Sequence, residues 1–251
     1  MKKYILLIVC TCISLYASAE DSMEKNGFGA KMCQSNFHLA VELQTKYVWR
    51  GMEMILLNSA PVLFPQINYQ YEGLYAYAMG GYSVNGNYAE VDLGVSYTWD
   101  FLTVGINDYY YPALDTIHDK YFNFNNSTTG HWLEAVITVA PEKIPAYLAV
   151  SNFFYGADKT PDGNQAYSTY VELGGYYDFQ KSNRLSLAIG AACNRSCYVG
   201  YENRFGICNI ELKYTYTLSF ENGWSIPLNV AYIINPVREK SFVNFSTSFA
   251  F

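Results

Sequence analysis

The feature that most constrains this chain is a period-two alternation of apolar and polar side chains. Between residues 36 and 50, Leu39, Val41 and Leu43 alternate with Glu42 and Gln44. Strand spacing places such residues on two opposite faces, whereas helical spacing would scatter the charges around the circumference. The alternation predicts twelve strands, at 36–50, 62–72, 74–84, 88–99, 101–110, 131–139, 146–155, 166–178, 184–193, 205–217, 223–234 and 242–251.

The connections between these strands alternate in length. Long ones fall at 51–61, 111–130, 156–165 and 194–204, and the connections between them are short. An even number of strands, with short turns at one rim and long loops at the other, is typical of outer-membrane barrels. We therefore expect an all-β fold, a transmembrane antiparallel up-and-down β-barrel.

Composition excludes other classes of protein. The chain is 15% charged and 18% aromatic, which is too apolar for a disordered chain. Its net charge of −6 argues against nucleic-acid binding, which needs a basic surface. Apolar residues make up 51% of the chain but the mean hydropathy is −0.03, so they are interleaved with polar ones, unlike a helical membrane bundle.

A soluble barrel would also alternate, with its apolar face inward. However, twelve strands enclose a lumen wider than side chains readily fill. The polar face also carries mid-strand charges, which a hydrated or self-paired lumen accommodates better than lipid does. We expect these residues to line the lumen: Glu42, Lys46, Arg50, Glu90, Asp92, Glu134, Glu172, Glu211 and Lys213.

Both ends of the sequence carry expected targeting features. Lys2 and Lys3, an apolar run and Ala17-Ser18-Ala19 predict a cleaved signal peptide over residues 1–19, with a permanent anchor helix as the alternative. Residues 20–35 would form an N-terminal periplasmic segment, and 36–251 the barrel. Phe249 and Phe251, in an alternating last strand, resemble an outer-membrane sorting signal.

The tryptophans predict aromatic girdles at the membrane interfaces. Trp49 is expected near the long-loop rim, and Trp99 and Trp224 near the short-turn rim; ordinary core packing is the alternative. Trp132 shares its parity with Glu134, so either a bulge shifts the register or its ring lines the lumen.

The chain carries several short motifs rich in aromatic residues, Gly and Asp. They are Tyr47-Val48-Trp49-Arg50-Gly51, Ile106-Asn107-Asp108-Tyr109-Tyr110, Gly156-Ala157-Asp158 followed by Pro161-Asp162-Gly163, and Tyr167-Ser168-Thr169-Tyr170-Val171-Glu172. Together they resemble the TorF-type porin family of small outer-membrane barrels. The resemblance covers nearly the whole chain after the signal peptide. It implies the barrel and its outer-membrane location, and it implies no substrate.

The sequence offers little for catalysis or metal binding. A barrel phospholipase needs a serine two residues after its histidine, and His38, His118 and His131 all lack one. Cys193 and Cys197 lack further ligands for a metal.

In an oxidising compartment, a disulfide among Cys193, Cys197 and Cys208 is more plausible than a metal site. The spacing does not choose between pairing Cys193 with Cys197 and pairing it with Cys208, and free thiols remain an alternative.

The expected function is therefore a porin-like passive channel, cation-leaning because acidic residues outnumber basic ones on the inward face. One alternative is a non-conducting barrel with a structural or surface-binding role through its extracellular loops. Another is a lipid-modifying enzyme. We expect no cofactor and no nucleic acid. The expected partners are outer-membrane lipid and, during biogenesis, the barrel-assembly machinery and periplasmic chaperones.

Overall fold

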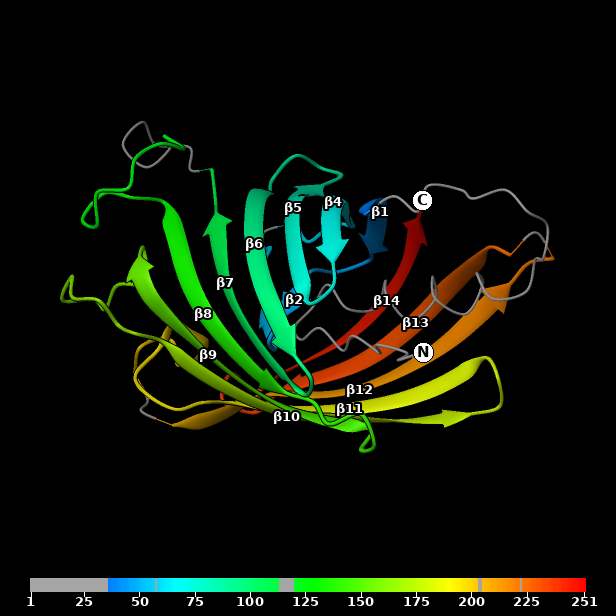
Figure 1. The fold of residues 1–251 in the computed structure, drawn as a ribbon. Helices are drawn as coiled ribbons and strands as arrows, with labels where there is room; N and C mark the ends of the chain where they lie inside the picture. The colour runs from blue at the N-terminus through cyan, green and yellow to red at the C-terminus, as the bar shows by residue number, and fades with distance from the viewer. Residues whose placement is uncertain (1–35, 57, 113–119, 203–204, 222) are drawn as a thin grey trace.

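The computed structural model describes residues 36–56, 58–112, 120–202, 205–221 and 223–251, and it shows a closed antiparallel barrel (Figure 1). Each wall strand pairs with the next wall strand in the sequence, and β1 pairs with β14 to close the cylinder. The wall strands are β1 (Phe37–Gln44), β4 (Val62–Tyr71), β5 (Leu74–Ser83), β6 (Ala89–Trp99), β7 (Leu102–Tyr110), β8 (His131–Val139), β9 (Ala146–Gly156), β10 (Thr169–Phe179), β11 (Asn183–Ala192), β12 (Gly206–Ser219), β13 (Ser225–Asn235) and β14 (Lys240–Ala250). The expected fold class is confirmed.

The first strand is the one element whose expected extent is wrong. Instead of continuing to Arg50, β1 ends at Gln44 and the chain turns away from the wall. Residues 48–53 form a small separate hairpin of β2 (Val48–Trp49) and β3 (Met52–Glu53), referred to below as the hairpin. A short 3₁₀ helix, η2 (Cys197–Val199), lies in the connection between β11 and β12. Within the described residues, no helix is long and apolar enough to cross a membrane.

The outward face of the wall is apolar. Exposed side chains on it include Ile106, Ile137, Leu148, Leu173, Leu187, Ile189, Leu212, Leu228, Val243 and Phe245. Closing the wall leaves no strand edge with unpaired backbone groups, as a lipid environment requires. A closed barrel with a continuous apolar exterior is a transmembrane barrel of the Gram-negative outer membrane.

The aromatic residues at the rims agree only in part with the expected girdles. Trp99 and Trp224 lie outside the wall at the short-turn rim, 56% and 50% exposed. Trp49 was placed wrongly: it is buried inside the barrel, because its segment leaves the wall after Gln44. Phe251 is exposed and its ring contacts Trp224, and their centroids are 5.6 Å apart. The sorting role of Phe249 and Phe251 stays a prediction.

Some expectations fall outside the described residues. They are the signal peptide at 1–19, the periplasmic segment at 20–35 with Cys33, and His118.

The two faces of β11 allow a direct test of which one meets lipid. We expect Leu187→Lys to lower the free energy of unfolding by about 2–4 kcal/mol, since it places an ammonium at the bilayer midplane. The neighbouring Ala188→Lys should cost much less, because residue 188 pairs with Glu211 on the lumen face. Urea unfolding of both variants in lipid vesicles measures the difference, and equal costs would contradict the assigned orientation.

Candidate functional site

The hairpin lies inside the barrel. Its two-residue turn is Arg50-Gly51, and both residues have positive φ, 50° and 74°, as a tight two-residue β-hairpin turn requires. Tyr47, Trp49 and Met52 are buried in the largest cluster of apolar residues, together with inward side chains of the wall. The sequence motif that was expected to end the first strand is therefore the tip of an internal hairpin.

The tip is pressed against the wall at β12 and β13. A Cβ added at Gly51 would lie 1.9 Å from the carbonyl oxygen of Cys208, so only glycine allows this approach. The buried side-chain amide of Asn235 donates a hydrogen bond to the Gly51 carbonyl at 3.0 Å. These two contacts fix where Arg50 projects.

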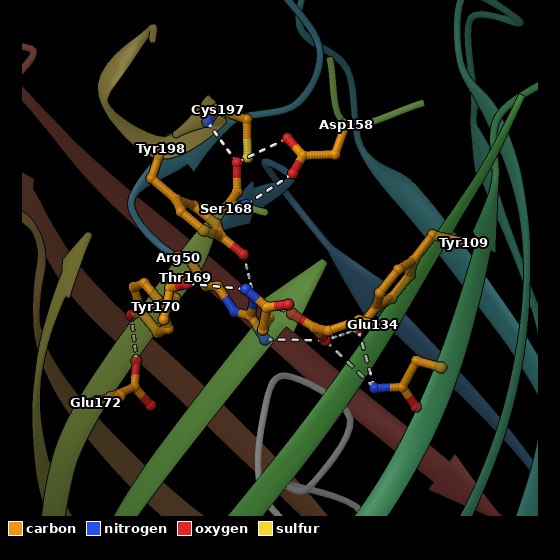
Figure 2. Close-up of polar contacts among 12 residues, drawn as sticks. Arg50, Tyr109, Glu134, Asp158, Ser168, Thr169, Tyr170, Glu172, Cys197 and Tyr198 are labelled. Atoms are coloured by element: carbon orange, nitrogen blue, oxygen red, sulfur yellow. Dashed lines mark hydrogen bonds and ion pairs between the residues drawn. The ribbon is translucent and has the colours of Figure 1, made fainter. Parts of the chain in front are cut away.

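Arg50 forms a buried ion pair with Glu134 on β8 (Figure 2). Nη1 and Nη2 donate to Oε1 and Oε2 at 2.5 and 3.2 Å, and the two side chains are 2% and 0% exposed. Glu134 also accepts from the hydroxyl of Tyr109 at 2.9 Å. Removing only one partner of such a pair strongly destabilises a protein, because the remaining charge stays buried without its partner.

Aromatic rings surround the guanidinium of Arg50. Its Cζ atom lies 4.3 Å from the ring centroid of Trp49, 4.7 Å from that of Tyr170 and 5.6 Å from that of Tyr198. A planar guanidinium can stack on rings while donating in a fork to a carboxylate, which an ammonium cannot. The site therefore requires arginine specifically.

The Tyr198 ring comes from a second segment that enters the lumen. Its hydroxyl accepts from Arg50 Nη1 at 2.5 Å, and burial raises its pKa, so the phenol stays protonated. The neighbouring Cys197 backbone N–H donates to Ser168 Oγ at 3.0 Å. Ser168 in turn donates to the buried Asp158 through its N–H and Oγ, both at 2.7 Å (Figure 2). Two connections at the long-loop rim are thus tied together near Arg50.

The other carboxylates near the hairpin are held mainly by tyrosines. Glu172 accepts from Tyr170, Tyr147 and Asn209 at 2.5, 2.7 and 3.3 Å. A Cβ added at Gly190 would lie 1.8 Å from the Tyr170 hydroxyl, so this glycine allows the ring to lie close to the wall.

Glu90 and Asp92 lie further round the wall, on β6. Glu90 accepts from Tyr88 at 2.6 Å, and Asp92 is 1% exposed. Among the described residues, Glu90 Oε1 and Asp92 Oδ1 have no hydrogen-bond partner.

The inward charges nearer the short-turn rim are reached by solvent. Asp178 and Arg184 pair at 2.6 Å with side chains 51% and 33% exposed. Glu211 and Lys213 lie 3.6 Å apart and are 28% and 31% exposed. Together with Glu42, which is buried, these residues line what we call the vestibule.

All of the residues expected to line the lumen thus lie inside the barrel. Lys46 and Arg50 reach it from the chain that leaves the wall, and Lys46 pairs with Glu53 of the hairpin. Trp132 also faces inward, packing on Phe153 with centroids 5.3 Å apart.

The expected disulfide is absent from the described residues: Cys193, Cys197 and Cys208 are free. Cys193 is exposed, whereas a register shift beside Gly190 turns Cys208 into the core. Simple alternation along β12 would place Cys208 outward with Ile210 and Leu212, and the register shift overrides it. Burial raises the pKa of Cys197 to about 12, so its thiol is protonated and unreactive.

His131 is engaged on the outer side of the wall. Its ring nitrogens contact the Asp108 carboxylate at 2.9 Å and the Tyr121 carbonyl oxygen at 2.5 Å, which leaves neither to activate a nucleophile. The described residues contain no group of three or more His, Cys, Asp or Glu side chains placed to hold a metal.

Sequence reasoning missed Tyr198, Asp158 and Ser168 as parts of the site. No local pattern marks these three residues, whereas the Arg50-Gly51 pair, which suits a two-residue turn, could have ended the first strand earlier.

No family model matches the chain, and no curated protein matches it. Solved structures similar to it are mostly outer-membrane barrels. The translocator domain of the autotransporter NalP from Neisseria meningitidis is 11% identical, with 94% of this chain and 92% of that chain covered and a TM-score of 0.43.

A mutant porin of Rhodopseudomonas blastica is 9% identical, with 82% and 62% covered and a TM-score of 0.39, so this chain spans less than two thirds of it. A chain from a study of in-meso crystallization of membrane proteins is 12% identical, with 86% and 83% covered and a TM-score of 0.49.

The close approach at Gly51 predicts how the hairpin can be released. Gly51→Ala should destabilise the hairpin by more than the 1–2 kcal/mol or so of left-handed strain, because the methyl group would also collide with β12. Gly86→Ala is the matched control, since Gly86 has φ 76° and open space around it. Tryptic cleavage after Arg50 should become fast only in Gly51→Ala. Equal cleavage rates in the two variants would contradict the close contact between the hairpin tip and β12.

Proposed function

We propose that this protein is a gated, porin-like outer-membrane channel whose gate is the hairpin. The observation that carries the proposal is the change in solvent exposure of the charged side chains along the lumen. The two ion pairs of the vestibule have side chains that are 28–51% exposed, whereas Arg50 and Glu134 are sealed. The seal is made by segments that fold inward from connections, and the wall behind them is complete without them.

The hairpin is suited to be a gate because side-chain contacts, and no backbone pairing, link it to the wall. Arg50 contacts Glu134 and Tyr198, and Gly51 contacts Asn235. Met52 and Glu53 contact Arg238 and Lys240 near β14. Its strands pair only with each other, so no strand-to-strand hydrogen bond of the wall breaks when the hairpin leaves. An interaction worth about 1.4 kcal/mol shifts the ratio of open to closed states about tenfold.

The charge left behind determines the proposed selectivity. Moving the hairpin outward removes the guanidinium of Arg50 from the lumen. The wall then carries four buried, inward carboxylates at this level of the lumen without the guanidinium: Glu90, Asp92, Glu134 and Glu172. A ring of carboxylates at a constriction favours cations, so the open channel would be cation-leaning.

A non-conducting barrel is the second candidate. The complete burial of the Arg50–Glu134 pair favours it, because opening must expose or separate these groups. No catalytic role is proposed. The motifs around Arg50 and Tyr170 also lead us to propose membership in the TorF-type porin family.

Single-channel recording in planar bilayers tests the gate. We expect the wild type to be mostly closed. Arg50→Ala combined with Glu134→Gln should open more often, because the ion pair is removed without leaving a buried charge. Deletion of residues 48–53 should give long-lived open steps. The control Asp178→Asn with Arg184→Ala removes an ion pair from the vestibule, remote from the hairpin, and should leave the open probability unchanged.

A folded deletion variant that never conducts would exclude the channel and leave the closed barrel. Heat-dependent gel mobility establishes whether the barrel of each variant is folded.

Reversal potentials under a salt gradient test the proposed selectivity. In the deletion variant, Glu90→Gln with Asp92→Asn should weaken the preference for cations, since two of the four carboxylates lose their charge. Glu221→Gln, in an exposed turn at the short-turn rim, should have little effect. An unchanged reversal potential in the first variant would refute the assignment of these carboxylates.

A further inference from the structure

The 120–130 segment, which precedes β8, folds back over the outside of the barrel wall. The alternation on β8 places Glu134 inside and His131 outside. An outward residue should meet lipid or water, yet His131 is fully buried. In Figure 1 this segment stands at the long-loop rim, beyond the ends of β7 and β8. Something in the segment must therefore cover His131.

The cover consists of Tyr121 and Phe124. The Phe124 ring stacks on the imidazole of His131 with centroids 4.3 Å apart and planes at 22°. Tyr121 packs its ring on Tyr110 at 5.1 Å, and its carbonyl oxygen lies 2.5 Å from His131 Nε2. Tyr110 and His131 are directly opposite each other on β7 and β8. The segment thus covers the outward side chains at the long-loop ends of these two strands.

Further hydrogen bonds fix the position and internal shape of the segment. The Tyr155 hydroxyl, from β9, donates to the Phe124 carbonyl at 2.5 Å. Lys159 donates to the Asn126 side chain at 2.9 Å. Within the segment, the Asn123 amide donates to the Thr128 carbonyl at 2.8 Å. The 120–130 segment is therefore an ordered loop that is hydrogen-bonded to β9 and to the connection that follows it.

This structure presents aromatic surface outward. Phe122 is 88% exposed and Phe124 is 48% exposed. Both belong to a segment that continues the lipid-facing exterior at the rim, where Phe154 on β9 is also exposed. Aromatic rings favour the headgroup level of a bilayer, and the exposed Lys120 beside them suits lipid phosphate.

We propose that the 120–130 segment rests on the outer leaflet, with Phe122 inserted between lipid headgroups and His131 as the positioning residue. The occupant of this surface is outer-leaflet lipid, because the surface is continuous with the lipid-facing wall. The proposal depends on the membrane-spanning barrel and is independent of whether the barrel conducts.

Spin labels measure the depth of this segment directly. Phe122→Cys is labelled with a nitroxide in a variant whose native cysteines are replaced, and the protein is placed in phospholipid vesicles. Oxygen concentrates in lipid and a nickel chelate in water, so their ratio of collision rates reports depth. We expect the label at residue 122 to favour oxygen, between the values for Leu187→Cys on the lipid face and Asp162→Cys in an exposed loop.

A ratio at residue 122 equal to that at residue 162 would overturn the proposal. Adding His131→Ala should move the ratio toward that of residue 162, and an unchanged ratio would remove the positioning role of His131. If the variant without native cysteines does not fold, Phe122→Trp in the native background gives a second test. Lipids brominated near the headgroup should then quench its added fluorescence, and a failure to quench would equally overturn the proposal.

Discussion

Closure of the wall by β1 and β14 is the constraint on which the rest of the structure depends. A backbone group that faces lipid without a hydrogen-bond partner costs several kcal/mol, so an open sheet could not remain in a bilayer. Five residues of β1, from Ala40 to Gln44, pair with β14, and the strand end at Gln44 coincides with the end of that pairing. Thr45 and Lys46 still hydrogen-bond to Phe245 and Asn244 of β14, and beyond them the chain leaves the wall and turns inward.

The inward turn places the hairpin inside the lumen. A barrel of this size cannot fill its interior with wall side chains alone. The hairpin supplies Trp49 and Met52 as apolar filling, and it supplies Arg50 as the charge that a wall rich in carboxylates needs. Tyr198 closes the site from the opposite connection. The same residues therefore fill space and balance charge inside the barrel.

The two rims differ in a way that follows from this arrangement. At the short-turn rim, inward charges pair loosely across strands and remain in contact with water. At the long-loop rim, connections fold in two directions: residues 45–56 and 195–202 enter the lumen, and 120–130 covers the outer wall. The asymmetry gives the molecule a hydrated compartment on one side and a structured surface on the other.

The sequence alone determined the wall. Period-two alternation assigned inner and outer faces correctly for residues such as Glu134 and Leu39, because each side of a strand meets a different solvent. It could not locate Trp49 or Cys208. Trp49 keeps the parity of an outward strand residue, yet the chain has left the wall before it. Cys208 lies where a register shift against β11 breaks the parity.

Only the tertiary structure decided that Arg50, Glu134 and Tyr198 meet. These residues are separated by long stretches of chain and are brought together by barrel closure, which has no local signature in the sequence. The alternation specifies which face each side chain takes, whereas the course of a connection depends on the space and charge that the finished wall encloses.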